Sequence, residues 1–447
     1  MTDANPTSAS QRGFLFNVNL VFLSQIAIYG FAFGIRVVLA RGLGDSGLGT
    51  YSLFFTAILV AAGIANLGVG LGNIYFLNKG EHGYRVLLSN SVALIGWTAL
   101  VGWFFVGVWA VVLEPELFVT GTAYWLYAAA LPAVVAYTLL TSFLHGSSRF
   151  VALTIVAVTQ GAVSFAAVGL LWVVDELDVA TAIAAWTASF AAADVLCLAL
   201  VGLGRIDPRI VLKPRWRPLK DQVVYGIKGQ AANMAALFNY RLDQFLVAAF
   251  ISRAAVGHYT VAVGLGESVW WLSSAVAVVM LPRLTAMDEG EAQEITPIVS
   301  RNTLFVSALA AIGVVVVSPL AIQMLFGQAF YPEAFLPLVL LMPGIVAASA
   351  TRVLGSYLFS QGRIIYNTYA TFIALGVTVG LDLVLIPLLD VEGAAIASSV
   401  AYTLALVATV HWYRRVSRRS AAEALIWSPA DLAYYVSALR RVLHRTR

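Results

Sequence analysis

A small set of charged side chains lies inside long apolar stretches of the sequence, where a buried charge is costly. The basic members are Arg36, Lys228, Arg241 and Arg352, and the acidic members are Asp194, Asp243, Glu267 and Asp382. Charged residues in such stretches usually face a partner of opposite charge or a water-filled cavity, and they mark substrate or ion pathways. These residues are therefore the first candidates for function.

Three of the basic residues, Arg36, Arg241 and Arg352, predict a cationic site for an anionic ligand. The planar guanidinium grips a phosphate through two parallel hydrogen bonds and keeps its charge at any accessible pH. The alternative is an ion pair with an acid of another helix, which lowers the burial cost without any ligand. Lys228 is a fourth substrate-binding candidate, although extension of its amine towards the headgroup region explains it equally well.

Asp243 and Glu267 are the candidates for coupling to an ion, either H⁺ or Na⁺. Intramembrane acids commonly serve as proton relays or as plain counter-ions, and both alternatives stay open. Arg241 is a poor partner for Asp243, because residues two apart point to different faces of a helix. Asp194 and Asp382 lie further along their stretches and are weaker candidates.

No other pattern in the sequence points to catalysis, so an enzyme is not predicted. His145 and His258 have no second ligand at metal spacing, and no nucleophile elbow or phosphate-binding loop occurs. We therefore expect no metal and no cofactor. The tryptophans, Trp270 and Trp271 among them, are mostly interpreted as anchors at the lipid interface.

The stretches that carry these residues are the spans of a membrane protein. Hydrophobic residues make up 60% of the 447 residues and charged residues 11%, whereas a soluble domain holds about 25% charged residues. A helix needs about 20 apolar residues to cross the hydrocarbon core. Continuous runs of this kind predict an all-α polytopic membrane protein with about twelve transmembrane helices, at 14–40, 50–77, 86–112, 122–145, 150–174, 179–203, 222–251, 255–281, 298–318, 333–360, 364–389 and 391–413.

A polar gap rich in Arg, Lys and Pro separates six of these runs from the other six. The predicted organisation is an N-terminal six-helix lobe at 1–203, a basic cytoplasmic linker at 204–221, a C-terminal six-helix lobe at 222–413 and a basic cytoplasmic tail at 414–447. An amphipathic helix is expected at 428–444 of the tail.

The two lobes look like copies of one another. Residues 140–144, followed by Arg149, resemble residues 354–358, followed by Arg363. Together with the equal number of spans, this similarity favours an internal duplication. Two parallel six-helix repeats usually hold the substrate between them and rock around it.

The distribution of Lys and Arg predicts the orientation, because these residues concentrate on the cytoplasmic side. With the N-terminus inside, most of the 27 basic residues fall in cytoplasmic segments. We therefore expect a multi-pass protein of the cytoplasmic membrane with both termini in the cytoplasm, and a monomer. The basic linker and tail are expected to contact anionic lipids, and nucleic acid is not an expected partner.

Short motifs occur along nearly the whole chain, at 36–44, 49–51, 65–68, 225–228, 242–245, 255–259 and 281–282. They resemble the polysaccharide transporter family, the Wzx-type flippases of the MATE-like multidrug/oligosaccharidyl-lipid/polysaccharide superfamily. The resemblance implies a V-shaped pair of six-helix bundles that moves lipid-linked oligosaccharides, carried on a polyprenyl (di)phosphate, to the outer leaflet for polysaccharide or glycan biosynthesis. It also implies a cationic cavity, which maps to Arg36, Arg241 and Arg352.

Two other functions are compatible with a chain of this kind. A MATE-like ion-coupled exporter of small molecules needs a negative cleft, and such relatives usually carry an acid in the first span. The run at 14–40 contains Arg36 and no acid. A membrane-bound glycosyl- or polyprenyl-phosphate transferase needs a catalytic loop, and the sequence shows none.

The predicted topology is tested with reporter fusions at Glu116 and Pro214. We expect the two fusions to report opposite sides of the membrane, with Pro214 in the cytoplasm. An external signal at Pro214 would overturn the orientation.

Overall fold

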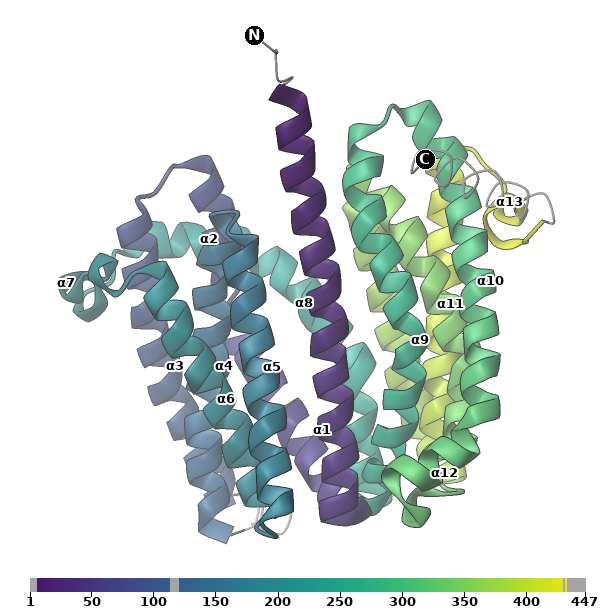
Figure 1. Ribbon diagram of the computed structural model, residues 1–447, viewed down its shortest axis with the longest axis horizontal. Helices are drawn as coiled ribbons and strands as arrows, with labels where there is room; N and C mark the ends of the chain where they lie inside the picture. Colours follow the sequence, from purple (N-terminus) through teal and green to yellow (C-terminus); the bar gives the residue numbers. More distant parts are fainter. Residues whose placement is uncertain (1–5, 113–119, 429–430, 432–447) are drawn as a thin grey trace. The chain divides into compact units, whose positions relative to one another are not determined.

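The computed structural model describes residues 6–112, 120–428 and 431. These residues divide into two compact units. Unit 1 comprises the described residues up to Phe238 together with Arg253–Gly257, and unit 2 comprises Asn239–Ser252 and the described residues from His258 onwards. Figure 1 shows that both units are built from helices, and the described residues contain no strand.

Unit 1 contains six long or medium helices and the first part of a seventh. They are α1 (Pro6–Ala65), α2 (Val69–Lys79), α3 (Tyr84–Val112), α4 (Thr120–Gly146), α5 (Phe150–Val173), α6 (Val179–Val201) and the start of α8 (Trp216–Phe250). The short helices η1 (Leu203–Arg205) and α7 (Pro208–Leu212) precede α8. Helices α3, α4, α5 and α6 pack side by side, and α1 packs on α5.

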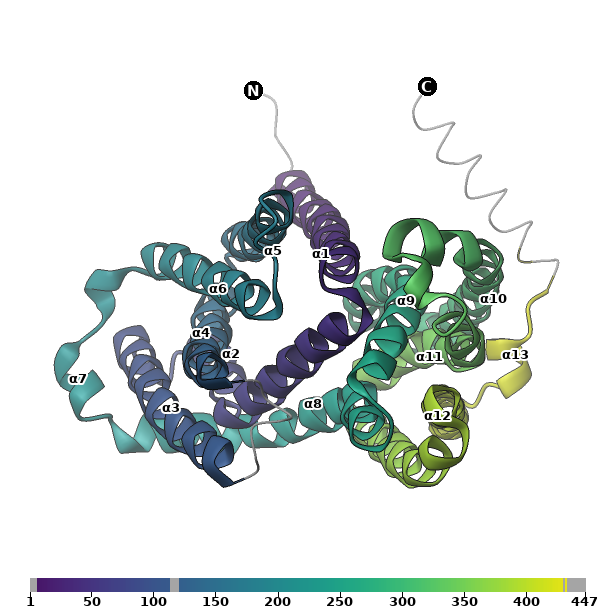
Figure 2. The ribbon, with the colours of Figure 1, turned by 90° about the horizontal axis from the view of Figure 1, so that it is seen from below.

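Unit 2 contains the end of α8, all of α9 except Arg253–Gly257, and the helices that follow. These are α9 (Arg253–Ala286), α10 (Glu289–Ala321), η2 (Ile322–Phe326), η3 (Gln328–Phe330), α11 (Phe335–Ser360), α12 (Ile364–Ser417) and α13 (Ala421–Leu425). Helix α11 packs between α10 and α12, an arrangement that can be followed in Figure 2.

Eleven of the twelve predicted spans each fall, within about two residues at their ends, on one helix, whereas the span predicted at 50–77 is divided between α1 and α2 by a turn at 66–68. Two predicted breaks coincide with kinks. Helix α1 is interrupted at Gly44, where φ is 69°, and α12 is interrupted at Leu389 and Asp390. Among the described residues, nine helices are long and apolar enough to cross a membrane. The all-α membrane fold is thereby confirmed, while the number of twelve spans stays a prediction.

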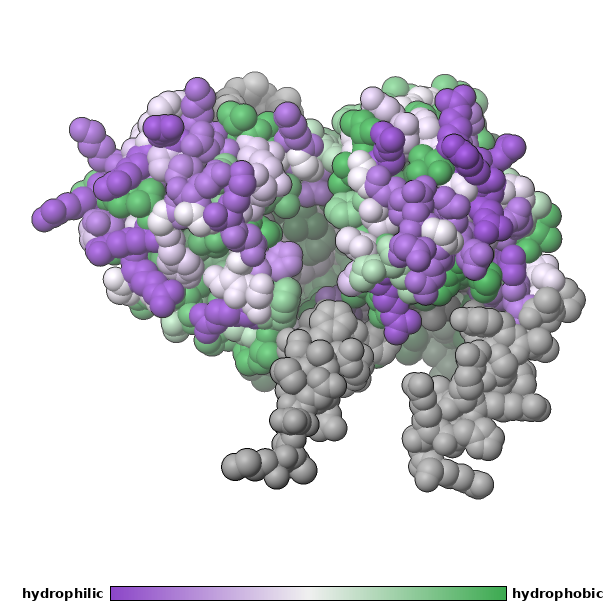
Figure 3. Space-filling model, turned by 90° about the horizontal axis from the view of Figure 1, so that it is seen from above, coloured by the Kyte–Doolittle hydropathy of each residue, from purple (hydrophilic) through white to green (hydrophobic). Residues whose placement is uncertain are grey.

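The flanks and ends of the helices match a lipid environment. On α10, Leu309, Ile312 and Val316 follow one another at helical spacing and are 53%, 61% and 72% exposed, so this face is available to lipid. On the view of Figure 3, hydrophilic side chains gather over the helix ends of each unit. Helix ends are where the chain leaves the hydrocarbon core.

Glycines let helices of unit 1 approach one another at backbone distance. Gly68 adopts a φ of +77° between α1 and α2, and a Cβ placed on Gly226 of α8 would lie 1.9 Å from the Gly68 carbonyl oxygen. One turn away, the Gln230 amide donates to the carbonyl oxygen of Gly63 at 2.7 Å. Only small residues permit such close crossings of membrane helices.

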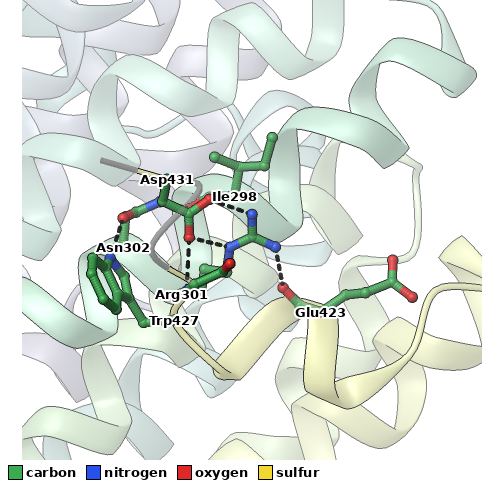
Figure 4. Close-up of polar contacts among 7 residues, drawn as sticks. Ile298, Arg301, Asn302, Glu423, Trp427 and Asp431 are labelled. Atoms are coloured by element: carbon green, nitrogen blue, oxygen red, sulfur yellow. Dashed lines mark hydrogen bonds and ion pairs between the residues drawn. The ribbon is translucent and has the colours of Figure 1, made fainter. Parts of the chain in front are cut away.

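In unit 2, the segment after α12 is fastened to α10 (Figure 4). Arg301 of α10 forms a two-fold ion pair with the Asp431 carboxylate and donates to the Glu423 carbonyl oxygen at 3.1 Å. The Trp427 indole N–H donates to the Asn302 side chain at 3.1 Å. The hydrogen bonds from Arg301 lower the pKa of Asp431 below its ordinary value. The amphipathic helix expected at 428–444 lies almost entirely outside the described residues.

The glycine crossing gives a stability prediction. Gly226→Ala forces two backbones apart, and overpacking of this kind typically costs about 1–3 kcal/mol or more. We expect a lower thermal unfolding midpoint and less monodisperse protein on size-exclusion chromatography. Gly169 of α5 is the matched control, because a Cβ there meets nothing within 4 Å. Gly169→Ala should leave the midpoint unchanged or raise it, since Ala favours helix. Equal midpoints for the two variants would contradict the close crossing.

Candidate functional site

Five of the charged residues singled out in the sequence lie in unit 2. Arg241 and Asp243 come from α8, Glu267 from α9, Arg352 from α11 and Asp382 from α12. Each is held by a long helix, so its place is fixed by packing rather than by a loop. Arg36, Asp194 and Lys228 belong to unit 1, so the single cavity predicted for Arg36, Arg241 and Arg352 stays a prediction.

Asp243 is a buried carboxylate that hydrogen bonds to three helices. Asp243 is only 2% exposed. Its Oδ2 accepts from the Tyr259 hydroxyl of α9 at 2.5 Å and from the Ser398 hydroxyl of α12 at 3.4 Å. Its Oδ1 accepts from the backbone N–H of Gln244 at 2.8 Å. The hydrogen bonds to this acid therefore come from neutral donors, and Arg241 adds an electrostatic interaction.

A second buried acid, Asp382, lies near enough to Asp243 to interact with it electrostatically, and it has fewer hydrogen bonds. Asp382 is fully buried, and neither carboxylate oxygen has a hydrogen-bond partner. It interacts electrostatically with Asp243. One turn earlier on α12, the Thr378 hydroxyl donates to the Asn239 side chain of α8 at 2.7 Å. The pairs Asn239/Asp243 and Thr378/Asp382 therefore present oxygen atoms from the same faces of two helices.

Arg241 is paired with Glu267. The distance between Arg241 Nη2 and Glu267 Oε1 is 2.9 Å, and the two side chains keep 18% and 19% of their exposure. The sequence left open whether Arg241 faces an acid or a ligand. The structure provides the acid, and both partners keep part of their side-chain surface exposed.

Arg352 has neutral neighbours instead of an acid. Its Nη1 donates to the Ser274 hydroxyl at 2.7 Å, and its guanidinium carbon lies 4.7 Å from the centre of the Trp270 ring. Its Nε is buried and has no hydrogen-bond partner. Within the described part of the chain, no acidic side chain lies within ion-pairing distance of Arg352. A cation–π contact offsets only part of the cost of a buried charge.

An aromatic cluster holds this region together, and the sequence did not predict it. The rings of Tyr240, Trp270 and Tyr402 lie with their centres 5.3–5.8 Å apart. Trp270 is 8% exposed and its indole N–H donates to the Ile345 carbonyl oxygen at 3.0 Å. Its interpretation as a lipid-interface anchor is therefore wrong. The neighbouring Trp271 is 37% exposed.

The remaining candidates lie in unit 1. Arg36 of α1 is half-buried and interacts electrostatically with Tyr51. Asp194 of α6 is buried, and its Oδ1 has no hydrogen-bond partner. Lys228 is exposed, which agrees with an amine that extends away from the helix. Across the ranges that the structure describes, no group of three His, Cys, Asp or Glu side chains could hold a metal ion.

The hydrogen bond between Tyr259 and Asp243 is tested by removing the donor. Tyr259→Phe leaves a buried carboxylate oxygen short of its strongest donor, and loss of such a bond costs about 1–3 kcal/mol. We expect a lower thermal unfolding midpoint in detergent. Thr260 is the control on the next residue of α9, because its buried hydroxyl has no partner. Thr260→Val should be neutral or stabilising; a similar loss in both variants would assign the effect to packing.

Comparison with known proteins agrees with the resemblance seen in the motifs. Residues 125–334 match the family model described as polysaccharide biosynthesis protein. No curated protein matches the chain. Three solved structures illustrate the similarity of fold. The lipid II flippase MurJ in an inward closed conformation has a TM-score of 0.71 and 12% identity, with 90% of each chain covered.

The other two structures are also transporters. An inward-facing multidrug resistance MATE transporter of the MOP superfamily has a TM-score of 0.67 and 14% identity, covering 88% of this chain and 94% of its own. A MOP superfamily transporter from Pyrococcus furiosus, described as having a binding pocket of reverse polarity, has a TM-score of 0.53 and 13% identity, covering 90% and 96%. Identities this low show the fold. The family match over residues 125–334 agrees with the resemblance to the polysaccharide transporter family, and the solved structures show that the chain shares the fold of MATE transporters and of MurJ.

Proposed function

We propose that this multi-pass membrane protein is a flippase that moves a polyprenyl-(di)phosphate-linked oligosaccharide across the cytoplasmic membrane by alternating access. The observation that carries the proposal is Arg352, a guanidinium inside an apolar helix whose neighbours are neutral. A charge in that position is costly unless a group of opposite charge compensates it. The anionic headgroup of the bound substrate provides that compensation.

The chemistry of the substrate suits a site of this kind. Sugar hydroxyls cannot cross hydrocarbon without hydrogen-bond partners, because each unsatisfied group costs several kcal/mol (~2–7). A polar site between helices supplies such partners, while the prenyl chain stays in lipid. Phosphate oxygens accept the parallel N–H bonds of a guanidinium, and the contact is stronger than a neutral hydrogen bond.

The charge of the site distinguishes this function from that of an exporter with the same fold. The structural neighbours include both a lipid II flippase and multidrug transporters, so the fold alone does not identify a substrate. A MATE-like exporter of small cations needs uncompensated acids where the ligand binds. Here the partly exposed acid, Glu267, is paired with Arg241, and the acids without an ion-pair partner, Asp243 and Asp382, are 2% and 0% exposed. The partly exposed group that keeps its charge is Arg352.

Asp243 and Asp382 favour coupling of transport to an ion gradient. Asp243 accepts from two hydroxyl groups, and both carboxylate oxygens of Asp382 have no hydrogen-bond partner. Buried acids of this kind can take up a proton or bind a small cation. Asp243 is therefore proposed as the coupling residue, as the sequence suggested, and Asp382 is added to it. Glu267, the other candidate from the sequence, is bonded to Arg241 instead.

The proposed substrate site is tested by substituting Arg352 and measuring flipping of a lipid-linked oligosaccharide in proteoliposomes. Arg352→Ala should lose at least about tenfold in rate, the equivalent of roughly 1.4 kcal/mol, while the protein still folds and inserts. Arg352→Lys keeps the charge but not the fork, so partial activity is expected. Arg283, exposed in the last turn of α9, is the control, and Arg283→Ala should flip normally. Full activity of Arg352→Ala would refute the role of this arginine.

Ion coupling is tested in the same vesicles with an imposed H⁺ or Na⁺ gradient. Asp243→Asn and Asp382→Asn should each lose the acceleration that the gradient gives, while substrate binding persists. Asp390 is exposed at the kink of α12, and Asn tolerates its positive φ, so Asp390→Asn is the control. If both buried acids can be replaced without loss of the gradient effect, they are structural.

A further inference from the structure

The ion pair between Arg241 and Glu267 differs from the other polar contacts of unit 2 in being partly open. Arg241 and Glu267 keep 18% and 19% of their side-chain exposure, whereas Asp243 keeps 2% and Asp382 none. Both side chains are still mostly buried, so opening the pair without replacing its charges is costly. A ligand that brings a new anion to Arg241 as Glu267 leaves offsets that cost, and the partial exposure marks the side from which it can approach.

A carboxylate and a phosphate compete for the same atoms of a guanidinium. Both offer two oxygens to its parallel N–H groups, and these are the preferred partners of arginine. Glu267 Oε1 already lies 2.9 Å from Arg241 Nη2. A phosphate that binds Arg241 must take the place of this carboxylate.

We propose that Glu267 is an internal anion that occupies Arg241 in the empty transporter and is displaced by the phosphate of the substrate. The inference rests on the proposed function and assigns Glu267 a role in controlling affinity. Arg352, which has no such acid, is the permanently available cation, and Arg241 becomes available only when Glu267 leaves.

The surroundings of the pair allow this exchange. Tyr240 and Tyr402 lie beside it, and Asp243 adds a second negative charge near Arg241. Trp270 follows Glu267 by about one turn on α9. The guanidinium carbon of Arg352 lies 4.7 Å from the centre of the Trp270 ring. When Glu267 leaves Arg241, it therefore moves in a region that still contains other polar and cationic groups.

With an internal competitor, the apparent dissociation constant is the intrinsic one divided by the fraction of molecules in which the site is free. If Glu267 holds Arg241 about 90% of the time, the apparent dissociation constant rises about tenfold. A flippase gains from this, because a headgroup bound by several arginines must also be released on the far side. Return of Glu267 to Arg241 then assists release.

The test measures binding of farnesyl diphosphate, a soluble prenyl diphosphate, to the full-length protein in lipid nanodiscs by calorimetry. Glu267→Gln removes the competing charge at nearly constant shape and should tighten binding about tenfold. Glu267→Asp keeps the charge on a shorter side chain, so a smaller gain is expected. Arg241→Ala should weaken binding, and adding Glu267→Gln to Arg241→Ala should restore nothing.

Glu294 supplies the matched control, because it is exposed on α10 and Glu294→Gln changes the net charge equally. Its affinity should equal that of the wild type. Unchanged or weaker binding by a folded Glu267→Gln variant would overturn the inference, as would equal tightening by Glu294→Gln or tightening that survives Arg241→Ala. If Glu267→Gln does not fold, unchanged or weaker binding by Glu267→Asp overturns it in the same way. Failure of the proposed function gives a different result: no variant, wild type included, binds farnesyl diphosphate better than farnesol.

Discussion

A charge placed inside a bundle of apolar helices must be compensated, and unit 2 is organised around three ways of doing so. Arg241 and Glu267 compensate each other across two helices at 2.9 Å. Asp243 is stabilised by hydrogen bonds from Tyr259, Ser398 and a backbone amide. Among the described residues, Arg352 receives a hydroxyl and an aromatic face but no acid, and the proposed anionic ligand would complete its compensation.

The packing of the helices makes these contacts possible. Long helices carry the charged residues, and their mutual rotation decides which side chains meet. The same helices need breaks where the chain turns, and Gly44 in α1 and Asp390 in α12 adopt the positive φ angles of such breaks. Within unit 1, Gly68 and Gly226 permit a crossing at backbone distance, as is common between membrane helices. The polar contacts are therefore held by the rigid part of the fold.

The sequence predicted the helices well, because apolar runs of sufficient length admit few other structures in a membrane. It also identified the important charges, because their cost depends only on their position within a run. The partners of those charges could not be found in this way. Asp243 and Ser398 are 155 residues apart, and the periodicity of an evenly apolar helix does not reveal which face meets its neighbour. For the same reason Trp270 was misassigned and Asp382 was given little weight.

Gene deletion tests the central claim most directly, because a cell that lacks a flippase leaves the substrate on the side of the membrane where it is made. Lipids from a deletion strain are extracted and the phosphate-linked glycans are identified, with their side of the membrane established by an impermeant glycosidase. The proposed function predicts that one polyprenyl-(di)phosphate-linked oligosaccharide accumulates on the cytoplasmic side and disappears when the wild-type gene is restored. No accumulation of any lipid-linked glycan, together with a gain in sensitivity to cationic compounds, would contradict it and favour a small-molecule exporter.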